Sequence, residues 1–160
     1  MAIQTGATLP TTTVHLKEDG SITETSLAAW SKGRKVVLIV VPGAFTPTCS
    51  ARHLPGYVKH TDAFAAKGIE AIGCMAVNDV HVMKAWGEHE DAEGKIDMIA
   101  DPFGTTADEM GILVVNTPVL GNTRAARLAL VAEDGVVTQL YMEEPAAFEV
   151  SAAEHVLARI

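Results

Sequence analysis

Residues 36–41, with the sequence VVLIVV, form the stretch that most constrains the fold of this chain. A run of β-branched and apolar residues without alternation is typical of a strand that is buried on both faces. Pro42 and Gly43 follow directly and are expected to end the strand. The run therefore predicts a central strand in a sheet that has helices on both sides, which is the arrangement of α/β proteins.

The segments after this strand alternate between helix and strand patterns. A helix is expected to begin at Pro47 and to continue to Gly68, with a kink where Pro55-Gly56 interrupts it. Three further elements complete the alternation: a strand at 69–77, a helix from Asn78-Asp79 to about 88, and a strand at 96–100. A strand-helix-strand order of this kind predicts parallel strand pairing.

Antiparallel hairpins are expected near both ends of the chain. The first joins 14–16 to 22–23 and leads into a short helix at 25–30, while the second joins 127–132 to 136–141 and is followed by a helix at 151–159. No repeat or linker divides the sequence. The predicted architecture is therefore one domain over residues 1–160, with a mixed β-sheet flanked by helices.

The composition excludes several classes of function. A formal net charge of -8 repels phosphate backbones and anionic lipids, so we expect no nucleic acid and no membrane as partners. Residues 1–10 lack a basic segment followed by an apolar one, which favours a cytoplasmic protein. The chain has only two cysteines and no CxxC, and its six histidines are scattered, so neither a metal site nor a cofactor is expected.

Residues 41–50, VPGAFTPTCS, place Cys49 in the first turn of the helix that follows the central strand. Unpaired backbone amides and the positive end of the helix dipole favour an anion at that place, and so favour the reactive thiolate of Cys49. The alternative is that Cys49 is a small buried residue, with Thr46 only capping the helix and Pro42 only making a turn. Cys74, inside the strand at 69–77, is expected to be structural.

Pro42, Thr46 and Cys49 reproduce the PxxxTxxC signature of peroxiredoxins. The longer string VPGAFTPTCSARHLPGY resembles the peroxiredoxin-five branch, including plant type II enzymes, and the resemblance continues through AVNDVHVMKAWG and GNTRAAR. It implies a thioredoxin-like fold with an N-terminal hairpin. It also implies an enzyme that reduces hydrogen peroxide and alkyl hydroperoxides through a sulfenic acid on Cys49.

The same resemblance suggests further residues of the site. It puts the family's catalytic arginine at Arg127 and a supporting arginine at Arg124, although Arg124 fits ordinary surface charge equally well. His53 lies four residues after Cys49, where either a polar contact near the site or helix packing is expected. Phe45 and Trp86 resemble positions that line the family's substrate funnel, and either also fits a core position.

The expected chemistry is attack of the Cys49 sulfur on the nearer peroxide oxygen, with negative charge building on the departing oxygen. Fixed donors must then address both oxygens, and we expect these to be the Thr46 hydroxyl, the Cys49 amide and the Arg127 guanidinium. Pro42 is expected to shield the sulfenic acid from water and from further oxidation.

Two-cysteine relatives resolve the sulfenic acid with a second cysteine shortly before or within the C-terminal helix. Residues 144–153 contain no cysteine, which predicts a one-cysteine cycle that an external thiol completes. The resemblance implies glutathione with glutaredoxin, or else thioredoxin, as that reductant, and a homodimer that meets near the active-site loops. The alternatives are a redox sensor that uses Cys49 oxidation as a signal, and resolution by Cys74 after local unfolding.

Overall fold

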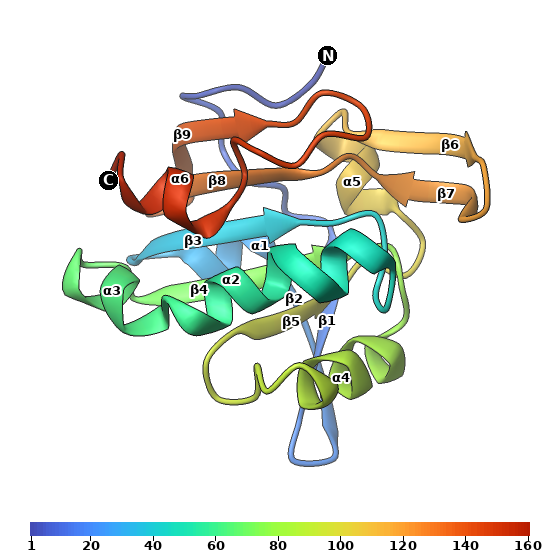
Figure 1. The fold of residues 1–160 in the computed structure, drawn as a ribbon, viewed down its shortest axis with the longest axis horizontal. Coiled ribbons are helices and arrows are strands. Elements are labelled where there is room, and N and C mark those ends of the chain that lie inside the picture. The colour runs from blue at the N-terminus through green and yellow to red at the C-terminus, as the bar shows by residue number, and fades with distance from the viewer.

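The computed structural model describes residues 1–160, apart from the side chain of Asn122 (Figure 1). Its elements in chain order are β1 (Thr13–Glu18), β2 (Ser21–Ser26), α1 (Leu27–Ser31), β3 (Lys35–Val40), the π-helical turn η1 (Cys49–His53), α2 (Leu54–Lys59), α3 (Thr61–Ala66), β4 (Ala71–Ala76), α4 (Val80–His89), β5 (Asp97–Ala100), α5 (Thr105–Glu109), β6 (Leu113–Thr117), β7 (Gly121–Ala125), β8 (Leu128–Glu133), β9 (Val136–Met142) and α6 (Ala153–Leu157).

The main sheet has seven strands in the order β2-β1-β5-β4-β3-β8-β9. β3 pairs in parallel with β4, and β4 with β5, whereas β8 pairs antiparallel with both β3 and β9, and β1 antiparallel with β2 and β5. The expected mixed sheet, with β3 near its middle, is confirmed. Figure 1 shows helices on both sides of it.

The run at 36–41 lacks alternation because each face of β3 packs against a separate core. Val37 and Ile39 pack with the side chains of α2, α3, α4 and α6 on one face. Val36, Leu38 and Val40 pack with α1, α5 and the N-terminal segment on the other. Full burial of each such side chain stabilises the fold by about 1.5–3 kcal/mol, so a polar residue is disfavoured at every position of the strand.

The expected N-terminal hairpin is confirmed, but the helix after it begins two residues later than predicted. Thr25 and Ser26 remain paired with β1, and the Ser26 hydroxyl oxygen accepts a hydrogen bond from the Ala29 amide. Ser26 is therefore the N-cap of α1, and the helix begins at Leu27.

The helix expected from Pro47 to Gly68 is irregular, and the irregularity lies before Pro55 rather than at Pro55-Gly56. The Leu54 amide donates to the carbonyl of Cys49, five residues back, in a π-helical turn. Pro55 has no amide hydrogen for the Ala51 carbonyl, and its ring crowds that carbonyl in a regular helix, so the wider turn relieves the clash. A second break, at His60, separates α2 from α3.

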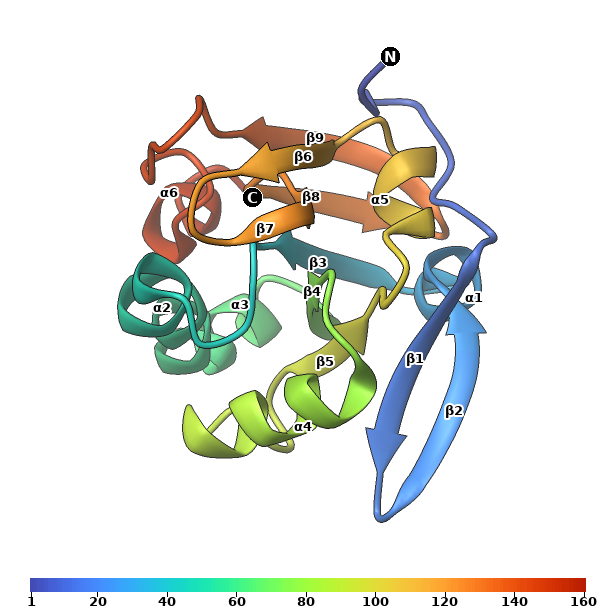
Figure 2. The same ribbon diagram turned by 90° about the vertical axis from the view of Figure 1, so that its right-hand side faces the viewer.

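Three elements are absent from the sequence prediction. The short helix α5 follows β5, and β6 and β7 form a separate two-stranded antiparallel sheet. Figure 2 looks at the side of the molecule where the β6–β7 hairpin lies close to the connection from β3 into the following helix. The predicted C-terminal hairpin is confirmed as β8 and β9, and the last helix is shorter than expected, at Ala153–Leu157.

Candidate active site

A tight loop carries the chain from β3 to the helix that bears Cys49. The Ala44 amide donates to the side-chain oxygen of Asn78 at 2.9 Å, which ties the loop to the segment after β4. Phe45 takes up a left-handed backbone conformation with φ 63, and the Thr46 carbonyl accepts the first helical hydrogen bond, from the Ser50 amide at 2.9 Å. The loop therefore fixes where the helix begins.

Cys49 lies in the first turn of that helix, as expected, and is fully buried. First-turn amides have no carbonyl of a preceding turn to bind, so they favour a thiolate there. The Arg127 Nη2 donates to the Cys49 Sγ at 3.2 Å. The structure thus brings the predicted nucleophile and the predicted arginine into direct contact, although 78 residues separate them in the sequence.

Arg127 also contacts His53, through its other terminal nitrogen. The distance from Arg127 Nη1 to His53 Nδ1 is 2.8 Å, and His53 Nε2 lies 3.1 Å from the Ser151 carbonyl oxygen. A carbonyl only accepts, so Nε2 carries the proton and Nδ1 is left to accept from the arginine. His53 therefore contacts the site rather than only packing within the helix.

His53 stays neutral because it is buried. Burial, reinforced by the positive charge of Arg127, lowers the pKa of His53 from 6.5 to about 3, against smaller opposing effects of the Ser151 carbonyl and Glu143. The imidazole is thus an acceptor for Arg127 at every physiological pH.

The Ser151 carbonyl is held in turn by a buried carboxylate that the sequence analysis missed. Glu143 Oε2 accepts from the Ser151 amide at 2.9 Å, the Ser151 hydroxyl at 2.6 Å and the Glu149 amide at 2.6 Å. Burial by itself raises the pKa of Glu143, but these hydrogen bonds outweigh it, and the pKa lies below its ordinary value. The Tyr57 hydroxyl also donates to the Ser151 carbonyl, at 2.7 Å.

Thr46 lies at the start of the helix that bears Cys49, and its hydroxyl does not offer a free donor. Its hydroxyl donates to the Gly43 carbonyl at 2.8 Å, which leaves the oxygen lone pairs to accept a hydrogen bond. The expectation of a Thr46 donor is therefore wrong for this conformation. Pro42 is half-buried in the turn after β3.

Arg124 lies on β7, against Gly43 of the loop that bears Thr46. Its guanidinium donates to the Val77 carbonyl at 2.9 Å and to the Leu120 carbonyl at 3.0 Å. A Cβ on Gly43 would come within 3.4 Å of Arg124 Nη1, so the glycine allows this close approach. Arg124 thus ties β7 to the segment after β4 and lies beside the loop at Gly43, so the interpretation as ordinary surface charge is wrong.

The two candidate funnel residues differ in their surroundings. Trp86 is fully buried in the core and its Nε1 donates to the Ser50 hydroxyl at 2.9 Å. Phe45 is 50% exposed, with its ring 6.5 Å from that of Trp86 and 5.7 Å from that of His89. Trp86 is therefore a core residue that binds the helix through Ser50, and of the two only Phe45 reaches the surface.

A second aromatic ring beside the site was also missed by the sequence analysis. Phe148, in the segment between β9 and α6, packs edge-on against His53 with 5.0 Å between ring centroids. The same ring contacts the guanidinium groups of Arg52, at 4.7 Å, and Arg127, at 5.9 Å. No sequence signal marks Phe148, because its partners are about 20 residues or more away along the chain.

Cys74 lies in β4, paired with Ile39 of β3 and Met98 of β5, and is fully buried. Burial, together with the neighbouring Cys49, raises the pKa of Cys74 well above the ordinary value of a thiol. Neither cysteine forms a disulfide. The surroundings of Cys74 agree with the expectation that it is structural.

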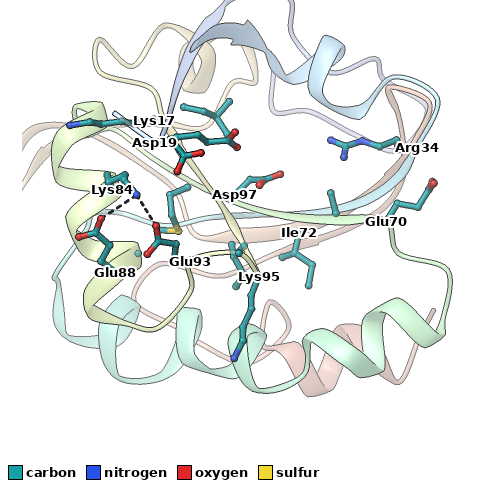
Figure 3. A pocket seen from close by; sticks show the side chains of 17 residues that line it. Lys17, Asp19, Arg34, Glu70, Ile72, Lys84, Glu88, Glu93, Lys95 and Asp97 are labelled. Carbon is teal, nitrogen blue, oxygen red and sulfur yellow. Dashed lines mark hydrogen bonds and ion pairs between the residues drawn. The ribbon is translucent and has the colours of Figure 1, made fainter. Parts of the chain in front are cut away.

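A charged pocket of about 440 Å³ lies between the β1–β2 hairpin, α4 and the first residues of β4 and β5 (Figure 3). Lys84 there pairs with Glu88 at 3.1 Å and Glu93 at 3.0 Å. The pocket is at the amino ends of β4 and β5, whereas Cys49 follows the carboxyl end of β3, which runs parallel to β4. The pocket and Cys49 therefore lie at opposite ends of these strands. None of the predicted site residues lines it.

Among the described residues, no group of three or more histidine, cysteine or acidic side chains is placed to hold a metal ion. No helix within the same range is long and apolar enough to cross a membrane.

Comparison with known proteins gives consistent likenesses over nearly the whole chain. The model of the Redoxin family matches residues 4–157. The chain is 39% identical to the chloroplastic peroxiredoxin-2E-2 of Oryza sativa subsp. japonica, over 97% of this chain and 71% of the relative. Reduced Prx3 of Vibrio vulnificus in complex with H₂O₂ superposes with a TM-score of 0.94 at 42% identity, covering 98% of both chains. Peroxiredoxin 5 of Alvinella pompejana superposes with a TM-score of 0.84 at 31% identity, covering 98% of this chain and 96% of its own.

Proposed function

Because the chain belongs to the redoxin family and is a peroxiredoxin, a thiol-dependent peroxidase with a thioredoxin-like fold, we propose that Cys49 attacks the hydroperoxide. The observation that carries this assignment is the 3.2 Å contact between Arg127 Nη2 and the Cys49 Sγ at a helix start. A fixed positive charge beside the sulfur stabilises the thiolate and the charge that moves off it during the reaction.

The reaction is an in-line displacement at the peroxide O–O bond. The Cys49 thiolate forms an S–O bond to the nearer oxygen while the O–O bond breaks, which oxidises the sulfur to a sulfenate and releases an alkoxide or hydroxide. A proton passes to the departing oxygen, so that the products are an alcohol or water. Arg127 and the first-turn amide of Cys49 are the proposed donors that stabilise this negative charge, and the contact of Arg127 with the sulfur supports that role.

Thr46 and Pro42 complete the proposed site. With its own hydrogen on the Gly43 carbonyl, the Thr46 oxygen accepts a hydrogen bond from the O–H of the hydroperoxide and so orients it. Pro42, in the turn after β3, limits access to the newly formed sulfenic acid and protects it from further oxidation.

A one-cysteine cycle is the second part of the proposal. Residues 144–153 contain no cysteine, and Cys74 is buried in the middle of the sheet. An external thiol therefore resolves the sulfenic acid, and glutathione with glutaredoxin is the proposed reductant, ahead of thioredoxin. Residues 1–160 act in this cycle as one domain.

We further propose a homodimer that meets near the active-site loops. Phe45 in the loop after β3 and Val115 and Val119 of the β6–β7 hairpin are exposed apolar side chains. Figure 2 shows this loop and hairpin on the same side of the molecule. Light scattering tests the proposal: a dimer mass that falls to the monomer mass in Val119→Lys supports it, and a monomeric wild type contradicts it.

The cytoplasm is the proposed compartment, on the ground that both cysteines are free thiols, as the reducing cytosol keeps them. The plant relative named above is chloroplastic, so fractionation of the source cells decides between the two.

A redox sensor is the alternative function, and it needs the same thiolate. The two differ in what happens after oxidation, since an enzyme returns to the thiol quickly when a reductant is present. Trapping the sulfenic acid with a dione probe, followed by mass spectrometry, tests the assignment of the nucleophile. Label on Cys49 supports the proposal, and label confined to Cys74 contradicts it.

A further inference from the structure

Arg52, on the turn η1 that begins with Cys49, is an exposed cation whose guanidinium packs on an aromatic ring. Its guanidinium carbon lies 4.7 Å from the centroid of the Phe148 ring. In the described part of the chain it forms no ion pair and no hydrogen bond through its side chain. Stacking on an aromatic face holds the planar group in one orientation and leaves its N–H donors open to solvent.

A second contact of the Phe148 ring relates Arg52 to the active site. The same ring contacts the guanidinium of Arg127, which in turn donates to the Cys49 Sγ at 3.2 Å. Arg52 also follows Cys49 by three residues on one helical turn. The charge of Arg52 therefore lies at the edge of the site.

No acid forms an ion pair with Arg52 in the described structure, and the carboxylate of Glu143 is taken up by donors of Ser151 and Glu149. The chain carries a net charge of -8, yet Arg127 is bonded to sulfur and imidazole, and Arg124 to backbone carbonyls. The acids of the Phe148 segment, Glu144 and Glu149, are exposed and make no ion pair with Arg52 in the described structure. The edge of the site is thus suited to an anionic reactant.

We propose that Arg52, stacked on Phe148, binds a carboxylate of the low-molecular-weight thiol that resolves the Cys49 sulfenic acid. The inference rests on the proposed one-cysteine function. A guanidinium fork matches a carboxylate through two parallel hydrogen bonds. In a short peptide thiol such as glutathione, each residue adds about 3.5 Å of extended chain, so a carboxylate one or two residues from the sulfur lies about 3.5–7 Å along the chain from it.

The step that this contact assists is thiol condensation with the sulfenic acid. The sulfur of the external thiolate forms a bond to the Cys49 sulfur while the S–O bond breaks, and the departing hydroxide takes a proton to become water. The Cys49 sulfur is reduced and the external thiol is oxidised, which gives a mixed disulfide that a second thiol then reduces.

The experiment follows the resolution step alone. Wild type is converted to the sulfenic acid with one equivalent of H₂O₂ and mixed with glutathione or with glutathione whose carboxylates are esterified, and glutathionylated Cys49 is quantified by mass spectrometry over time. Arg52→Ala and Arg52→Lys are compared with Lys59→Ala, which removes an exposed charge from the same helical segment without touching Phe148.

We expect Arg52→Ala to slow the reaction with glutathione by about fivefold, the size typical of an exposed but oriented charge pair. The esterified thiol should react at the same rate with wild type and Arg52→Ala. Arg52→Lys should restore part of the rate, and Lys59→Ala should behave as wild type.

Several outcomes overturn the proposal. Equal losses with glutathione and its ester show that the charge of Arg52 does not act on a carboxylate, and an equally large loss in the H₂O₂ step shows that it acts on Cys49 itself. A slower reaction only with a carboxylate-bearing hydroperoxide assigns Arg52 to the oxidant. If wild-type sulfenic acid is not reduced by glutathione at all, the proposed function fails and the inference fails with it.

Discussion

The sulfur of Cys49 and the imidazole of His53 bind the two terminal nitrogens of one guanidinium. Arg127 Nη2 lies 3.2 Å from the Cys49 Sγ, and Arg127 Nη1 lies 2.8 Å from His53 Nδ1. His53 is fixed in turn by the Ser151 carbonyl. The direction of the Arg127 donor is therefore set by residues behind it, before any peroxide binds.

Replacement of Arg127 tests the charge that faces the reaction. Arg127→Ala is expected to slow the peroxide step by about 10²- to 10³-fold, as for loss of one preorganised donor. Arg127→Lys should recover little of this, because a single ammonium cannot span both Cys49 and His53. The single-turnover rate with H₂O₂, followed by intrinsic tryptophan fluorescence, measures the effect.

Arg159→Ala is the matched control, because Arg159 is exposed and donates only to the His155 carbonyl. Its rate should equal that of wild type. An Arg127→Ala variant within threefold of wild type would exclude the arginine from transition-state stabilisation.

His53 makes the fold sensitive to mild acid. Its pKa is about 3 in the folded chain and 6.5 in the unfolded chain, so between these values the unfolded chain binds more protons. The contribution of neutral His53 to the free energy of unfolding is therefore complete above pH 6.5. It is lost as the pH falls, by about 1.4 kcal/mol per pH unit.

In urea unfolding, wild type should lose about 2 kcal/mol more than His53→Gln between pH 7 and pH 5. The other histidines are common to both chains and cancel in the comparison. Parallel losses in the two proteins would show that His53 is protonated in the folded state.

The sequence predicts much of this fold because buried strands and turn residues leave local signals. The run at 36–41 marks β3 and Pro47 marks the helix start. Together they place Cys49 in the first turn of the helix that follows a central strand. Arg127 was assigned from the family resemblance and because it opens an otherwise apolar strand, where a permanent charge needs a partner. Arg124, three residues earlier, binds backbone carbonyls instead.

Glu143 is expected to act on the site through the segment that it holds. Glu143→Ala leaves three donors on Ser151 and Glu149 without their acceptor, which should lower the free energy of unfolding by about 1–3 kcal/mol. Loosening the Ser151 carbonyl should also slow the peroxide step, because His53 and Arg127 lose their support.

Glu143→Gln should fall between wild type and Glu143→Ala, because the amide oxygen still accepts hydrogen bonds. The neighbouring exposed residue gives the control Glu144→Ala, which should change neither quantity. Loss of stability in Glu143→Ala with an unchanged peroxide rate would show that the segment does not position the site.

Cys74→Ala tests whether the second thiol takes part in turnover. The side chain is buried between β3 and β5, so its removal should cost about 1 kcal/mol of stability and leave turnover within twofold of wild type. Turnover is measured with an external thiol in excess. A tenfold loss in a folded variant would assign Cys74 a resolving role and contradict the one-cysteine cycle.

Most of the features that the sequence did not predict depend on contacts between distant residues. Glu143 reads as one of several loop acids, and its role appears only where Ser151 meets His53, 98 residues away. The β6–β7 hairpin was not predicted although Pro118 and Gly121 lie at its turn, and it packs outside the main sheet. The π-helical turn has a local cause. Pro55 lacks an amide hydrogen and so indicated an irregular helix, but it did not indicate whether the irregular turn comes before or after Pro55.

The central claim is that Cys49 turns over peroxide with an external thiol, and steady-state H₂O₂ consumption tests it most directly. Wild type and Cys49→Ser are compared with glutathione plus glutaredoxin and, in parallel, with thioredoxin plus its reductase. We predict sustained turnover of wild type with glutaredoxin and none in folded Cys49→Ser. Turnover in Cys49→Ser would contradict the assignment of the nucleophile, and no turnover of wild type with either system would identify a sensor rather than a peroxidase.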